Sequence, residues 1–119
     1  MHHGAQAYAR TAQHTASPRE RDAQVLLRAA ARFAAAQSAT PFDVTGAREA
    51  ATFNRKVWTV FLSAASREDN PLDAATKQNI KKIALFVMDR SLSVEIDPKP
   101  EQLDALITIN RNVAEGLRG

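Results

Sequence analysis

Apolar positions along residues 17–119 recur at spacings of three and four, which is the period of an amphipathic α-helix. Four such segments are separated by short stretches that contain proline or polar residues. The pattern predicts helices over residues 18–37, 45–65 and 71–92, and a last helix that begins at Pro100. Val94-Glu95-Ile96 alternates, but it is too short for an independent strand. The sequence therefore predicts an all-α protein, a small four-helix bundle.

Proline and capping residues mark where these helices begin. Ser17-Pro18-Arg19-Glu20 places a serine at the N-cap, proline at N1 and glutamate at N3, the arrangement of a capping box. The second helix has two candidate caps, Asp43 and Thr45. Asn70 followed by Pro71 predicts the start of the third helix, and residues 93–99 are expected to form the connector to the fourth.

Residues 1–16 differ from the rest, since they are small and polar and Tyr8 is their only large side chain. We expect them to form a mobile N-terminal arm, followed by a single helical domain over residues 17–119. His2 and His3 are either native or the remnant of a tag, and no site is inferred from them.

The two middle helices carry more apolar surface than one core contact requires. The second helix has two stripes, Ala50, Phe53, Val57, Val60, Phe61 and Ala64, and then Ala47, Ala51, Trp58, Leu62 and Ala65. The third has a main stripe that includes Ile80, Ile83 and Val87, and a separate set of Leu85, Met88 and Leu92. One interpretation is that the outer helices cover all of these side chains. The other is that Trp58, Leu62, Leu85, Met88 and Leu92 receive an amphipathic helix of a partner.

Asn110 lies in the middle of the apolar stripe of the last helix. A polar side chain at such a position requires a buried hydrogen-bond partner. We expect this partner to be a group such as a backbone carbonyl or the end of a neighbouring helix.

Composition narrows the class of protein. A chain of 119 residues suits one domain, and the absence of cysteine excludes disulfides and thiolate sites. No apolar run reaches the roughly 18 residues that span a bilayer, and the N-terminus lacks the apolar core of a secretory signal. We therefore expect a cytoplasmic protein. The net charge of +3 arises from residues 1–40, and a solvated basic face explains it more simply than an acidic partner does.

Candidate catalytic chemistry is sparse. His14 is the only histidine beyond position 3, the glycines form no phosphate-binding loop, and Glu68-Asp69 is an acidic pair expected in a solvated turn. No two histidines have the helical spacing of a metal site, and the chain has no cysteine. We expect neither catalysis nor a metal or cofactor.

Nucleic-acid binding has somewhat more support. Basic residues occur on the third helix and on the second, at Lys77, Lys81, Lys82, Arg48, Arg55 and Lys56. Acidic residues interrupt both groups, and Trp58 is flanked by apolar residues instead of a basic groove suited to stacking. Direct RNA contact is therefore the less favoured reading.

Six segments distributed over nearly the whole chain resemble, in order and spacing, the FlaF family of flagellar biosynthesis regulators. They are AYARTAQ (7–13), SPRE (17–20), FNRKVWTVFLSA (53–64), NPLDAATKQNI (70–80), ALFVMDR (84–90) and INRNVAEGL (109–117). No single segment is a chemical signature, so the resemblance depends on their combination.

The resemblance implies a small cytoplasmic helical protein needed for flagellin production and export, similar in role to flagellin secretion chaperones. Such proteins also act on flagellin synthesis, opposite a second regulator named FlbT, and they serve the flagellar export apparatus. Flagellin termini are amphipathic segments that would associate prematurely if uncovered. The resemblance makes Trp58, Leu62, Leu85, Met88 and Leu92 candidate flagellin contacts.

The match at residues 7–13 adds Tyr8 and Arg10 to the candidates, which we expect to order against the bundle or against flagellin. Two other readings stay open. One is a post-transcriptional regulator that contacts flagellin mRNA, directly or through FlbT. The other is a self-associating helical bundle.

Overall fold

The computed structural model describes residues 17–119, and this part of the chain consists of helices joined by short connections, without a β-strand. The prediction of an all-α bundle is therefore confirmed. The elements are α2 (Pro18–Ser38), α3 (Val44–Ala65), α4 (Ala74–Ile96), the short 3₁₀ turn η1 (Pro100–Gln102) and α5 (Leu103–Arg118). The predicted N-terminal arm, with Tyr8 and Arg10, lies outside the described residues.

The first two helices begin where capping chemistry places them. The Ser17 hydroxyl accepts a hydrogen bond from the Glu20 amide at 3.1 Å, with Pro18 at the first helical position. The Glu20 carboxylate does not close the predicted capping box, since it pairs with Arg118 of α5 at 3.0 Å. For α3 the cap is Asp43, whose carboxylate accepts from the Gly46 amide at 2.9 Å.

The predicted start of the third helix at Asn70 is wrong. Helix α4 begins at Ala74, and Asp73 is its cap through a 2.7 Å bond from the Thr76 amide. Asn70 instead forms a local turn, accepting from the Leu72 amide at 2.9 Å and donating to the Ala64 carbonyl at 3.1 Å. An asparagine side chain offers the backbone this alternative to a helix start.

The predicted end of that helix near Leu92 is also wrong, because α4 continues to Ile96. Val94 is fully buried. Glu95 accepts from the Thr52 hydroxyl at 2.6 Å and from Arg55 Nε at 3.0 Å, both on α3. These tertiary contacts keep the last turn helical where the local sequence gives no clear preference.

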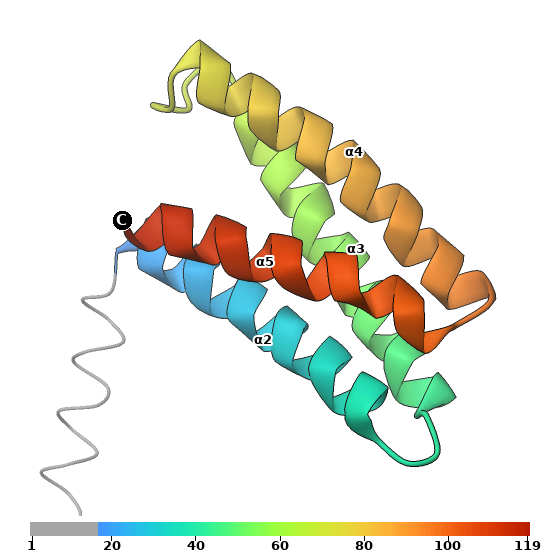
Figure 1. Cartoon of the computed structure of the whole chain (residues 1–119). Helices are drawn as coiled ribbons and strands as arrows, with labels where there is room; N and C mark the ends of the chain where they lie inside the picture. The colour runs from blue at the N-terminus through green and yellow to red at the C-terminus, as the bar shows by residue number, and fades with distance from the viewer. Residues whose placement is uncertain (1–16) are drawn as a thin grey trace, which may run out of the picture.

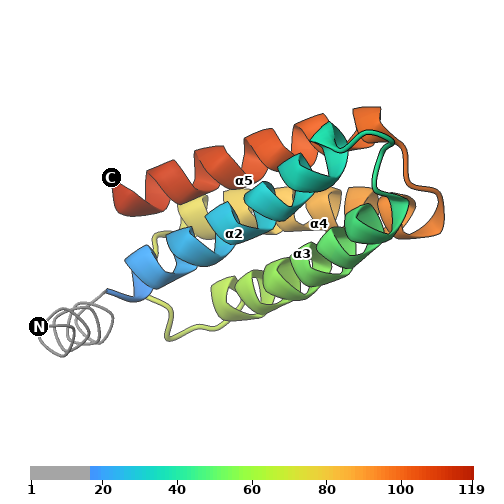
Figure 2. The same cartoon turned by 90° about the horizontal axis from the view of Figure 1, so that it is seen from below.

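The four helices form two antiparallel pairs (Figure 1). Helix α2 packs along α5, α3 packs along α4, and contact between α2 and α3 joins the pairs. The pairs converge where the α2–α3 and α4–α5 connections lie and diverge toward the end that carries the α3–α4 connection (Figures 1 and 2). The molecule is consequently flat, with extents of 45 × 43 × 20 Å.

A chain of buried polar side chains crosses the core between the two pairs. Trp58 Nε1 donates to Asn110 Oδ1 at 3.0 Å, and Asn110 Nδ2 donates to Asn54 Oδ1 at 2.7 Å. Asn54 Nδ2 then donates to the Ser91 hydroxyl at 3.2 Å. The prediction that Asn110 needs a buried partner is confirmed, although its partners are side chains of α3. Because an unmade buried hydrogen bond is costly, this chain fixes how α5 crosses α3 and α4.

Candidate functional site

An exposed apolar surface follows the outer side of α4. Helix α4 packs on α3 through Ala84, Val87, Ser91 and Val94, all of them fully buried. Leu85, Leu92 and Ile96 lie on the opposite side and are 63%, 47% and 70% exposed. Their spacing of seven and four residues places them on one stripe, about 16 Å long at 1.5 Å per residue. We call these three residues the outer face of α4.

Two further apolar side chains of α4 flank this stripe. Met88 is half-buried and packs against the core. Phe86 is 43% exposed, and the guanidinium carbon of Arg90 lies 5.0 Å from the centroid of its ring. The outer face of α4 is therefore bordered on one side by the flexible side chain of Met88. On the other side it is bordered by Phe86, whose ring is covered by the Arg90 guanidinium.

The prediction that Trp58 is available to a partner is wrong. Trp58 is 1% exposed, donates its indole N–H to Asn110, and meets the ring of Phe61 edge-on at 5.5 Å between centroids. Leu62 is likewise partly buried against the core. Helix α3 buries the stripe that contains Ala47, Ala51, Trp58 and Ala65, whereas Val60 of the other stripe is 65% exposed. The apolar surplus of α3 thus belongs mainly to the core.

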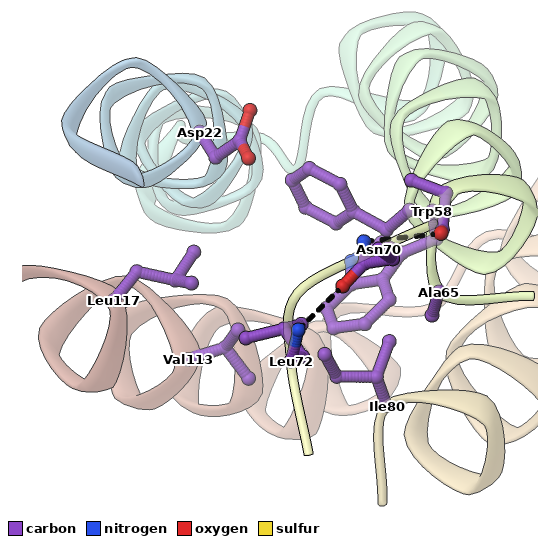
Figure 3. A pocket seen from close by; sticks show the side chains of 10 residues that line it. Asp22, Trp58, Ala65, Asn70, Leu72, Ile80, Val113 and Leu117 are labelled. Atoms are coloured by element: carbon purple, nitrogen blue, oxygen red, sulfur yellow. Dashed lines mark hydrogen bonds between the residues drawn. The ribbon is translucent and has the colours of Figure 1, made fainter. Parts of the chain in front are cut away.

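A small apolar groove opens where the two helical pairs diverge (Figure 3). Its volume is about 90 Å³, and side chains from all four helices and the α3–α4 connection surround it. They are Asp22, Trp58, Phe61, Ala64, Ala65, Asn70, Leu72, Ile80, Val113 and Leu117. We call this space the groove. Nothing in the local sequence pattern predicts it, because its walls come from segments far apart in the chain.

Asp22 supplies the only carboxylate in the wall of the groove. Burial raises the pKa of the Asp22 carboxyl, and the charge of its neighbour Arg21 offsets this only in part. Within residues 17–119 the structure gives Asp22 no salt bridge. A half-buried carboxylate beside apolar side chains favours a cationic partner.

A second concavity, shallow and basic, lies between α2 and α3. It is lined by Arg32, Arg48, Glu49, Thr52, Phe53 and Lys56, and the Arg32 guanidinium carbon lies 4.9 Å from the Phe53 ring centroid. The other basic residues named in the sequence analysis are Arg55 on α3 and Lys77, Lys81 and Lys82 on α4. In this concavity Arg32, Arg48 and Lys56 line the same space as the Phe53 ring.

Among the described residues, no three histidine, cysteine or acidic side chains come together in a group that could hold a metal ion. No helix in this part of the chain is long and apolar enough to span a bilayer.

The sequence reasoning found Leu85 and Leu92 of the outer face but missed Ile96. Ile96 lies in the stretch predicted to be a connector, so its position on the same helix, four residues beyond Leu92 and eleven beyond Leu85, was not apparent. Extending the helical period of α4 by one turn would have revealed it.

Comparison with known proteins gives one match. The family model described as flagellar protein FlaF matches residues 4–117, nearly the whole chain. No curated protein and no solved structure matches.

Proposed function

Since the chain belongs to the FlaF family of flagellar proteins, we propose that it binds flagellin as an export chaperone and thereby affects flagellin synthesis. Its role is flagellar, and we propose that it acts by binding and not by catalysis. The observation that carries the proposal is the outer face of α4, with Leu85, Leu92 and Ile96 on one exposed stripe.

The geometry of this face suits a helical partner. Three anchors on one stripe, over about 16 Å or three turns, match the spacing at which amphipathic helices pack against each other. Flagellin termini, as amphipathic segments, would place their own apolar stripe here. Met88 at the edge supplies a side chain that adapts to a partner's shape. In this arrangement Trp58 and Leu62 support the fold and do not touch flagellin.

The size of the face suits a transient complex. A chaperone must release flagellin to the export apparatus, so a few anchoring side chains in a modest interface serve better than a large permanent one. Helix α4 packs almost entirely on α3 and meets α5 at few positions. Binding on its outer side therefore requires no opening of the core.

Isothermal titration of monomeric flagellin into the full chain tests the proposal. We expect saturable binding by the wild type and at least a tenfold weaker affinity for Leu85→Ser/Leu92→Ser. Val60→Ser is the matched control, because Val60 is equally exposed but lies on α3. A folded wild type that does not bind flagellin contradicts the chaperone proposal. Binding that is unaffected by the double substitution contradicts the site.

The basic concavity favours a second candidate, a regulator that contacts flagellin mRNA directly or through FlbT. Arg32, Arg48 and Lys56 surround an aromatic ring, Phe53, as in sites that combine phosphate contact with base stacking. In a gel-shift titration, the affinity for flagellin mRNA would then fall steeply as the salt concentration rises. The double substitution Arg32→Gln/Lys56→Gln would lower it as well. A flat salt response contradicts direct RNA contact.

A further inference from the structure

We propose that the groove between the two helical pairs is the docking site of this chain's own N-terminal segment, residues 1–16, with the Tyr8 ring in the groove and Arg10 on Asp22. The proposal concerns contacts within one chain. It is therefore independent of whether flagellin binds the outer face of α4.

The first argument is where the described chain begins. Ser17, the cap of α2, stands five residues before Asp22, which is about 7.5 Å along the helix at 1.5 Å per residue. Asp22 lies in the wall of the groove. The nine residues from Tyr8 to Ser17 reach at most about 30 Å. Because Ser17 lies close to the groove, a segment that ends at Ser17 is long enough for Tyr8 to reach it.

The second argument is complementary charge. Residues 1–16 contain Arg10 and no aspartate or glutamate. Asp22 is half-buried and is given no salt bridge within residues 17–119. An arginine from the segment would supply the missing cation, through charge-assisted hydrogen bonds to the carboxylate.

The third argument is the size and chemistry of the groove. An apolar cavity of about 150 Å³ holds a benzene ring, so the groove, at about 90 Å³, accommodates an aromatic ring in part. Leu72, Val113 and Leu117 turn apolar side chains toward this space (Figure 3). Tyrosine suits such a site, because its ring is apolar and its hydroxyl can remain in water. Tyr8 is the only phenylalanine, tyrosine or tryptophan among residues 1–16.

The fourth argument is that the family pattern includes this segment. The FlaF model begins to match at residue 4, so Tyr8 and Arg10 belong to the family sequence and are not an appended tag.

Disulfide trapping tests the proposal directly, because the chain has no cysteine of its own. The test variant is Ala9→Cys/Leu117→Cys, which places the second cysteine at the groove. The control variant is Ala9→Cys/Ala31→Cys, which places it at an exposed position of α2. Under mild oxidation of the full chain without flagellin, we expect the groove pair to form an intramolecular disulfide at least ten times faster. Adding Tyr8→Ala or Arg10→Glu should slow it at least fivefold, while circular dichroism shows unchanged helicity.

Three outcomes overturn the proposal. Equal rates for the groove pair and the control pair would leave the groove to another occupant, such as a flagellin segment. A trapping rate unaffected by both Tyr8→Ala and Arg10→Glu would exclude the assigned contacts. Disulfide-linked dimers as the main product would mean that the groove takes the segment of a second copy.

Discussion

The indole N–H of Trp58 donates to the side-chain oxygen of Asn110 at 3.0 Å, and both residues are at most 1% exposed. Trp58 belongs to α3 and Asn110 to α5, so the bond joins the two helical pairs at the point where they cross. The large aromatic side chain that the sequence suggests as an anchor for a partner therefore holds the fold together.

Trp58→Phe should lower the free energy of unfolding by about 1–3 kcal/mol, because it leaves Asn110 Oδ1 buried without its donor. Urea denaturation followed by circular dichroism measures this. Asn110→Ala removes the acceptor, and we expect the two substitutions together to cost less than the sum of the single effects. Strictly additive costs would show that the bond does not couple the helices.

Substitutions on the outer face of α4 should leave stability nearly unchanged. Leu85→Ala and Ile96→Ala remove side chains that are 63% and 70% exposed, and we expect changes within about 0.5 kcal/mol. Val87→Ala, on the fully buried side of the same helix, should cost about 2 kcal/mol. Thermal or urea denaturation compares the three. A large loss for Leu85→Ala would mean that this face is already covered.

Glu95 should contribute to stability in a pH-dependent way. Burial alone would raise the pKa of Glu95, but hydrogen bonds from Arg55 and Thr52 and the charges of Arg55 and Lys56 outweigh it and lower the pKa below the ordinary 4.5. The ionised carboxylate therefore stabilises the fold above about pH 4.5, and this contribution is lost as the pH falls below that value toward the native pKa.

Denaturation of the wild type and of Glu95→Gln between about pH 7 and pH 3 checks this sign. We expect Glu95→Gln to be less stable at neutral pH and to lose less stability in acid. Parallel curves for the two proteins would contradict a stabilising role of the ionised carboxylate.

Gly46→Ala should destabilise α3 although alanine favours helices. A Cβ at position 46 meets the Asp43 carboxylate that caps the helix. The gain in helix propensity, about 1 kcal/mol, is then offset by a disturbed cap, worth about 0.5–2 kcal/mol. In an Asp43→Ala background the same substitution should stabilise. Urea midpoints of the four proteins give the comparison, and stabilisation by Gly46→Ala in both backgrounds would contradict the clash.

Local signals predicted most of the fold. The period of apolar residues predicted four helices, and Ser17-Pro18 marked the start of α2 because capping depends on neighbouring residues. For α3 the sequence left two candidate caps, Asp43 and Thr45, and the structure has Asp43. Asn70 and Asp73 are both competent caps, and the choice between them rests on a bond from Asn70 to the Ala64 carbonyl. Ile96 remained helical through tertiary contacts of the last turn of α4.

The candidate site was harder to predict, because it depends on contacts between residues that are far apart in the chain. Leu85 and Leu92 were found because exposure on α4 follows from one helical period and one packing partner. The burial of Trp58 depends on Asn110, 52 residues away, and the groove depends on all four helices at once. Pattern along the chain shows which side chains are apolar, but not which of two faces a distant helix covers.

Photo-crosslinking gives the most direct measurement of contact between flagellin and the outer face of α4. A benzophenone amino acid replaces Leu92 in one full chain and Ala31, exposed on α2, in another. Flagellin should be covalently captured from position 92 upon irradiation, and captured at least ten times less from position 31. Equal capture from both positions, or none from position 92 by a folded chain, would contradict the account.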